Sequence, residues 1–168
     1  MAELTTVERL QPSLIDRLTD DEPEKQTETR ERRVMTMPQL RQAVLRDLNW
    51  LLNASSRPLG DEIHKMPNAG SSVVNFGMPD LTGMSSSGVA LSDVERMVTK
   101  AIRAFEPRIM RAGMEVKAVT GGSADDHNVL SLEISGDLWA RPLPESLYIR
   151  TEVDLETGRF HVRERAGV

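Results

Sequence analysis

The residues best suited to chemistry follow one another at the end of an amphipathic segment, as Glu106, Pro107 and Arg108. A carboxylate at a helix end, beside the apolar Phe105, could be one of the two acids that a glycosidase needs. No second acid is marked out as its partner. Arg108 would also stabilise the charged form of Glu106, whereas a general acid must be protonated. We therefore do not expect this triplet to be catalytic.

Two interpretations of the triplet remain open from the residues alone. It could be a helix stop that carries an ordinary surface ion pair, worth less than about 1 kcal/mol. Alternatively, proline stiffens the backbone, and residues two apart in an extended corner point the same way. The carboxylate of Glu106 and the guanidinium of Arg108 would then be presented together, as a bidentate docking element requires.

Other kinds of reactive site find little support in the sequence. The chain has no cysteine, which excludes disulfides, thiolate metal sites and cysteine nucleophiles. His64, His127 and His161 are scattered and lack the spacing of metal ligands. No nucleophile motif and no phosphate-binding glycine pattern occurs. We expect a protein that is not an enzyme and that holds no metal and no cofactor.

Length and charge narrow the possible partners. A chain of 168 residues with 39% hydrophobic content can build one ordinary core. Its 26 acidic and 21 basic side chains give a net charge of −5, which argues against nucleic acid or an anionic membrane as the main partner. No apolar run is long enough to span a membrane, and the first residues are acidic where a signal peptide is basic. We expect a soluble protein that is not exported.

Two amphipathic helices are predicted to position the triplet. The first covers residues 35–53 and begins with a capping pattern of Thr36 and Gln39. The second covers residues 92–108, begins with a capping pattern of Ser92 and Glu95, and ends at the proline. Their apolar faces consist of Leu40, Val44, Leu48, Leu51 and Leu52 in the first helix, and of Val94, Met97, Val98, Ala101, Ile102 and Phe105 in the second.

From Met114 onward the hydrophobic period changes from 3.6 to 2, which predicts strands. We place them at residues 114–120, 129–135, 146–153 and 159–163. Tight turns are expected at Gly121-Gly122 and at residues 156–158. Helices followed by an antiparallel meander indicate an α+β fold, with N-terminal helices packed on a small antiparallel sheet.

The domain organisation follows from the composition. Residues 1–34 are predicted to hold a short helix, at 7–18, and a charged flexible linker, at 19–33. Residues 35–165 are predicted to form a single α+β domain. A helix as short as 7–18 needs a partner surface, either on its own domain or on another protein, and the residues leave both open.

Five blocks of sequence carry a family resemblance. PSLIDRL, VLRDLNWLLN, VVNFGMPDLTG, IRAFEPRI and WARPLPESLYIRTEVDLETGRF occur in this order between about Pro12 and Phe160. Together they closely resemble the TssE-type subunit of the type VI secretion baseplate. That family is homologous to a wedge subunit of contractile-phage baseplates and is often labelled lysozyme-like. Glu106-Pro107-Arg108 after an amphipathic helix is its signature.

The resemblance implies a structural role in the cytoplasm, on a baseplate docked at the inner-membrane complex. Such subunits bridge two wedge proteins, of the TssF and TssG types, and seat the first sheath ring of TssB- and TssC-type subunits to start its polymerisation. A TssK-type subunit is a further candidate partner. Neither nucleic acid nor direct membrane insertion is implied. The fold should resemble the handshake domain of the sheath protein, and Glu106, Pro107 and Arg108 should bind partners.

Two further alternatives stay open. Residues 147–153 and 160–163 are candidates for the sheet face or edge that accepts a sheath strand, although both could lie inside the meander. The alternative function is a muramidase that trims peptidoglycan for the apparatus. Its substrate lies outside the cytoplasm, which counts against it.

Overall fold

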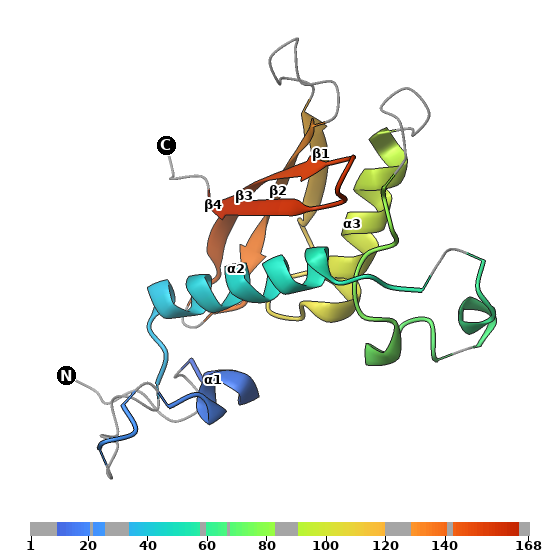
Figure 1. Cartoon of the computed structure of the whole chain (residues 1–168). Helices are drawn as coiled ribbons and strands as arrows, with labels where there is room; N and C mark the ends of the chain where they lie inside the picture. The colour runs from blue at the N-terminus through green and yellow to red at the C-terminus, as the bar shows by residue number, and fades with distance from the viewer. Residues whose placement is uncertain are drawn as a thin grey trace.

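The computed structural model describes residues 10–20, 22–25, 34–57, 60–66, 68–82, 91–119, 129–140 and 143–164. This part of the chain has the predicted α+β fold (Figure 1). Its elements are, in order, α1 (Leu14–Leu18), α2 (Met37–Asn53), the 3-10 turns η2 (Glu62–Lys65) and η3 (Val73–Asn75), α3 (Leu91–Phe105), β1 (Glu115–Val119), β2 (Val129–Leu138), β3 (Glu145–Asp154) and β4 (Phe160–Glu164).

The start of α2 confirms the predicted capping box. The amide of Gln39 donates to the Thr36 hydroxyl at 3.4 Å, and the amide of Thr36 donates to the Gln39 side chain at 2.8 Å. Pro38 lies in the first helical turn, where no hydrogen bond from its nitrogen is needed. The helix therefore begins two residues later than predicted and ends at Asn53, as predicted.

The predicted capping box at Ser92 is wrong. α3 begins at Leu91, so Ser92 lies inside the helix and does not have the extended backbone of an N-cap. The Glu95 carboxylate accepts instead from the amide of Ala118 in β1, at 2.7 Å. A tertiary partner has replaced the local one, and no local pattern in the sequence predicts it. The end of α3 at Phe105, ahead of Pro107, agrees with the prediction.

The sheet is an antiparallel meander of order β1-β2-β3-β4. β2 and β3 are ten residues each, longer than predicted, and pair along their whole length. The predicted turn at Gly121-Gly122 lies outside the described residues. The turn at 156–158 is present, with Gly158 at a φ of 68° and its amide donating to Asp154 O at 2.7 Å. Because β3 pairs with both neighbours, residues 147–153 are interior, and only β4 of the two candidate strands lies at a margin.

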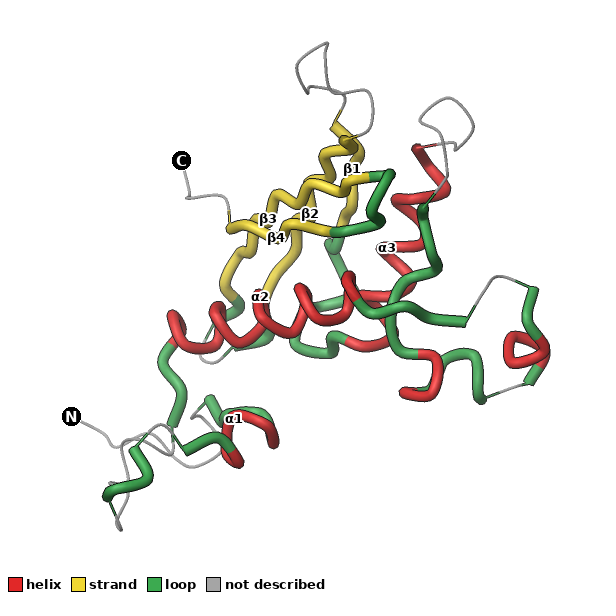
Figure 2. Tube along the Cα trace, in the orientation of Figure 1, coloured by secondary structure: helices red, strands yellow, loops and turns green. Residues whose placement is uncertain are grey.

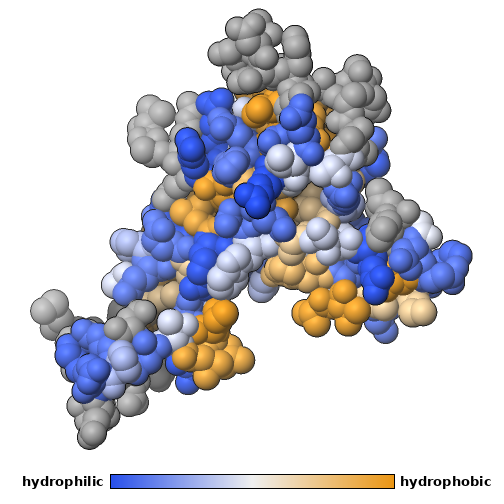
Figure 3. Space-filling model, viewed as in Figure 1, coloured by the Kyte–Doolittle hydropathy of each residue, from blue (hydrophilic) through white to orange (hydrophobic). Residues whose placement is uncertain are grey.

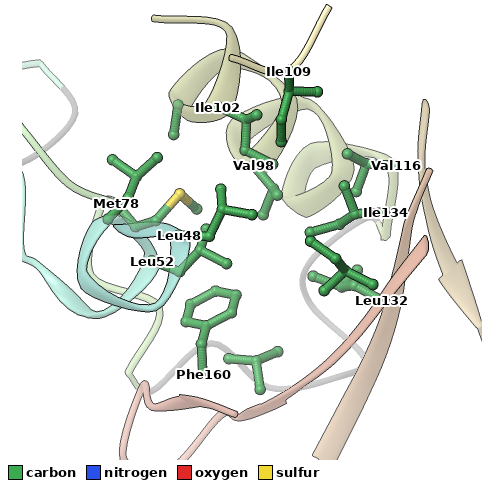
Figure 4. Close-up of a cluster of buried hydrophobic side chains, with 14 of the residues drawn as sticks. Leu48, Leu52, Met78, Val98, Ile102, Ile109, Val116, Leu132, Ile134 and Phe160 are labelled. Atoms are coloured by element: carbon green, nitrogen blue, oxygen red, sulfur yellow. The ribbon is translucent and has the colours of Figure 1, made fainter. Parts of the chain in front are cut away.

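One core holds the helices against the sheet. α2 and α3 lie on the same face of the strands (Figure 2). Every apolar residue predicted for α2 is buried, as are Val94, Val98, Ala101 and Ile102 of α3; Met97 and Phe105 are partly buried. Alternate residues of the inner strands meet them, among them Leu132 and Ile134 (Figure 4). Full burial of each such side chain contributes about 1.5–3 kcal/mol.

α1 differs from the helix expected at 7–18. It spans five residues, and residues 7–9 lie outside the described part. The Leu10 carbonyl accepts from Met35 N at 2.9 Å, which holds the segment beside the start of α2. Leu14 and Leu18 are nevertheless 72% and 76% exposed, and Figure 3 shows hydrophobic surface at α1. The apolar face of α1 is thus turned away from the domain core.

Candidate functional site

The corner after α3 is fixed in place by main-chain bonds. Glu106 N continues the helix by donating to Ile102 O at 2.8 Å, and proline then ends it. Arg108 O accepts from Trp139 N at 2.7 Å, and Met110 N donates to Asp137 O at 2.8 Å. The corner is therefore a turn attached to the end of β2, and not the extended segment of the second interpretation.

Glu106 and Arg108 pair with each other. Oε1 of Glu106 accepts from the Arg108 amide at 3.1 Å and from Nε at 2.7 Å, while Oε2 accepts from Nη2 at 2.5 Å. This is the bidentate arrangement in which guanidinium and carboxylate bind most strongly. Glu106 is only 4% exposed, whereas Pro107 is exposed and the Arg108 side chain is 21% exposed. The carboxylate is thus turned inward, and the proline and part of the arginine face outward.

The pair belongs to a longer series of ion pairs, here called the charge chain: Glu106, Arg108, Asp47, Arg46 and Asp16. Nη2 of Arg108 lies 2.6 Å from Asp47 Oδ2 on α2. Asp47 Oδ1 accepts from Arg46 Nε at 2.9 Å, and Arg46 Nη1 donates to Asp16 Oδ1 on α1 at 2.6 Å. Acid and base alternate without interruption. The charge chain therefore connects the corner through α2 to the N-terminal helix.

The electrostatics favour the charged forms of Arg108, Arg46 and Asp16. Burial would lower the pKa of Arg108, but the hydrogen bonds and charges of Glu106 and Asp47 outweigh it and raise that pKa. The hydrogen bond to Asp16 raises the pKa of Arg46. Burial raises the pKa of Asp16, yet the Ser13 hydroxyl and Arg46 together leave it below its ordinary value. Each shift favours the charged form.

Two guanidinium nitrogens of the charge chain are buried without a hydrogen-bond partner among the described residues, Nη2 of Arg46 and Nη1 of Arg108. Nη2 of Arg46 still lies 2.8 Å from Asp47 Oδ1. A buried guanidinium nitrogen without an acceptor is costly, and in native structures it calls for a specific explanation. An acceptor brought by another molecule would satisfy it.

Both tryptophans of the chain flank the charge chain. The Arg46 guanidinium stacks on Trp50 at 5.1 Å, and Trp139 is bonded to Arg108 through its main chain. Trp50 is 49% exposed and Trp139 is 52% exposed. Tryptophan and arginine are enriched where protein interfaces bind most strongly. The surroundings of the corner therefore have the composition of a protein-binding surface.

Sequence reasoning missed most of this site. It singled out Glu106, Pro107 and Arg108, but not Asp47, Arg46 or Asp16, which lie 61 or more residues from Arg108. Neither Asp47 nor Arg46 was predicted to be a site residue. Arg46 and Asp47 lie one helical turn before the exposed Trp50, and this position was the available sign that they belong to the site. The pairing with Arg108 has no local signature.

The described residues hold no group of three or more His, Cys, Asp or Glu that could bind a metal ion. Of the three histidines, His127 lies outside the described part, and His161 lies on β4, away from the corner. In the same part of the chain, no helix is long and apolar enough to cross a membrane.

A comparison with protein families decides the identity. The family model for baseplate wedge protein gp25 matches residues 38–143, which is more than half of the chain. The chain belongs to this family. No match was found among curated proteins or among solved structures.

The matched range shows which parts of the site the wedge family model covers. It includes α2, α3, β1 and β2, and so takes in the corner together with Arg46 and Asp47. α1 with Asp16, β3 and β4 lie outside it. The family is one of baseplate wedge proteins, which indicates a structural role and association with other baseplate components. It includes the TssE-type subunits that the sequence resembles.

Proposed function

We propose that the protein is the TssE-type subunit of a type VI secretion baseplate, acting in the cytoplasm below the inner-membrane complex. It bridges the TssF- and TssG-type wedge proteins and seats the first sheath ring. A TssK-type subunit is a further candidate neighbour. The observation that carries the proposal is the match to the wedge family over the stretch that builds the corner.

The geometry supports a division of roles within the triplet. Pro107 and the outward part of Arg108 contact a wedge protein, while Glu106 holds the guanidinium in position from within. Exposed Trp139 and Trp50 supply apolar area on either side. A rigid surface of this kind loses little conformational entropy on binding.

The muramidase alternative receives no support from the site. A glycosidase acid must reach the glycosidic oxygen of its substrate. The Glu106 carboxylate is 4% exposed, and both of its oxygens already accept from Arg108. We propose that the protein is not an enzyme.

A capture experiment tests the function. The tagged full chain is co-expressed with the two wedge proteins, and their recovery is compared for wild type, Arg108→Ala and Trp139→Ala. Arg111→Ala is the matched control, because Arg111 is an exposed arginine of the same segment outside the charge chain. Both test variants should lose the wedge proteins while the control retains them, with folding checked by circular dichroism. Recovery that is unchanged in folded variants would refute the role of the corner.

A peptidoglycan-release assay tests the alternative in parallel. Wild type should release nothing above background. Release by wild type that Glu106→Gln abolishes would overturn the structural assignment in favour of a muramidase.

A further inference from the structure

The two margins of the sheet differ in which main-chain groups are free to pair. In the β3–β4 ladder, Asp154 N donates to Arg159 O at 2.9 Å, which fixes the alternation of inward and outward groups. The N–H and C=O groups of Phe160, Val162 and Glu164 therefore point away from β3, along the outer edge of β4 (Figure 1).

The first of these positions is closed by a side chain. Asn53, the last residue of α2, donates from Nδ2 to Phe160 O at 3.0 Å and accepts at Oδ1 from Phe160 N at 3.0 Å. Its amide thus makes the two bonds that a residue of a neighbouring strand would make. Nδ2 also donates to Asn49 O at 2.9 Å, which holds the amide in place.

The next position is not closed in this way. Among the described residues, none forms a hydrogen bond with the outward groups of Val162. Exposed edges of this kind can accept a strand from another chain. Beside Asn53 lies a hollow of about 530 Å³, whose lining includes Phe160, His161 and Gly158. It offers room for an added strand to turn away once it reaches Asn53.

At the opposite margin of the sheet, on β1, a carboxylate already occupies an outward main-chain amide. The Ala118 amide points outward from β1, and Glu95 of α3 occupies it at 2.7 Å. An incoming strand would have to replace this charge-assisted bond with a neutral carbonyl and place that carbonyl next to a carboxylate. Charged side chains at sheet edges are a known defence against unwanted pairing. The β1 edge is therefore disfavoured.

A row of charges across the open face indicates the chemistry of the added strand. Lys117, Glu133, Arg150 and Arg163 lie in register on the four strands, on the face opposite the helices. Charge alternates until the last two, where two arginines stand directly opposite each other, an unfavourable pairing. Within the described part of the chain, Arg150 Nε is buried without a partner and Arg163 forms no ion pair. An acid beyond Arg163 would continue the alternation.

We propose that a partner strand with alternating apolar and acidic side chains pairs with β4 from Val162 onward, and that Asn53 ends the pairing and so sets its register. An acidic side chain of that strand lies beside Arg163, in the closely spaced type of pair, and an apolar one lies beside Val162, which is partly buried against the core. The inference rests on the proposed function, in which the protein seats the first sheath ring, and assigns the added strand to a sheath subunit.

A tethered strand tests the edge without the secretion apparatus. A Gly/Ser linker and a strand of alternating Val and Glu are appended to the C-terminal end of the full chain, which gives a millimolar effective concentration. Backbone amide exchange is then followed by NMR at Val162, Phe160 and Ala118. A strand of alternating Val and Lys is the matched control.

The Val/Glu strand should slow exchange of the Val162 amide by about tenfold or more, and leave Ala118 unchanged. The Val/Lys strand should slow it less than about threefold, and Arg163→Glu should reverse the preference. In Asn53→Ala, the Phe160 amide should exchange fast without the strand and slowly with it, because pairing now runs past the former stop. Asn53 is exposed, so this variant should fold.

Three results would overturn the proposal: protection at Ala118, equal protection by both strands, or no protection at Val162. Failure here, with wedge proteins still captured by the corner, would remove the β4 edge but leave the baseplate role. Protection of the Val162 amide without capture of wedge proteins would keep the β4 edge as a strand-binding site but remove the baseplate role of the corner.

Discussion

The bidentate pair at the corner can be tested by a double-mutant cycle. Arg108→Ala leaves the Glu106 carboxylate, 4% exposed, with only its bond to the residue 108 amide. Three charge-assisted hydrogen bonds are lost: two to Glu106, at 2.7 and 2.5 Å, and one to the more exposed Asp47, at 2.6 Å. Each of the two to Glu106 contributes about 1.5–3 kcal/mol. Because the Arg108 side chain is 21% exposed, water reaches the site and the lower end applies. We expect a cost of about 3 kcal/mol, at the low end for a broken buried pair.

Glu106→Ala should cost less, about 2 kcal/mol, because Arg108 keeps Asp47 as a partner. The double variant should then cost about 3 kcal/mol, which implies a coupling of about 2 kcal/mol. Urea unfolding measures the three values, and the melting temperature of Arg108→Ala should fall by about 6–12 °C. Arg111→Ala, on the exposed part of the same loop, should stay within about 0.5 kcal/mol of wild type. Additive costs, or a cost of Arg108→Ala below about 1 kcal/mol, would refute the pairing.

Three further outcomes are expected. Asp16 has a lowered pKa in the fold, so its contribution to the attachment of α1 is complete above the ordinary value of about 3.9 and is lost as pH falls through the lower folded value. The protection of the Met35 amide, which bonds Leu10 O, relative to its intrinsic exchange rate at each pH, should therefore fall in that acid range in wild type but not in Asp16→Asn. Leu18→Glu should change the free energy of unfolding by less than about 0.5 kcal/mol, since Leu18 is 76% exposed. The same variant should abolish capture of the wedge proteins if the face of α1 binds them, and unchanged capture would assign that face no role. Gly77→Ala should lower the free energy of unfolding in urea by about 2 kcal/mol or more, because an added Cβ would lie 2.2 Å from Ala54 O at a φ of 119°. Gly60→Ala, which has open space around the added Cβ, should lower it clearly less, and equal losses would contradict this reasoning.

The match between predicted and observed elements has a local cause. α2 carries its own start signal in Thr36 and Gln39, and its apolar spacing allows only one buried face. The strands were found because apolar and polar residues alternate with period 2. The lengths of β2 and β3 were underestimated, and in β2 the reason is that Gly136 and Asp137 break the alternation but still pair with β3. Pairing continues there because the hydrogen bonds between β2 and β3 join main-chain groups and do not depend on which side chains are present.

The candidate site was predictable only in its first three residues. Glu106, Pro107 and Arg108 are adjacent, so their proximity needs no fold. The positions of Asp47 and Asp16 depend on how α2 packs beside the corner and on how α1 lies against α2. The partner-binding role of Glu106, Pro107 and Arg108, and the division of the chain at residue 34, stay predictions.

By itself, the sequence determined the elements, their buried faces and the rigidity of the corner, because each depends on neighbours within one or two turns of the chain. The tertiary structure decided where the polar groups find their partners. The Glu95 carboxylate bonds the amide of Ala118 and not the predicted helix cap, and the side chain of Asn53, at the end of α2, bonds the backbone of Phe160. Hydrogen bonds and ion pairs act over about 3 Å, so they form only between groups that packing has already brought together.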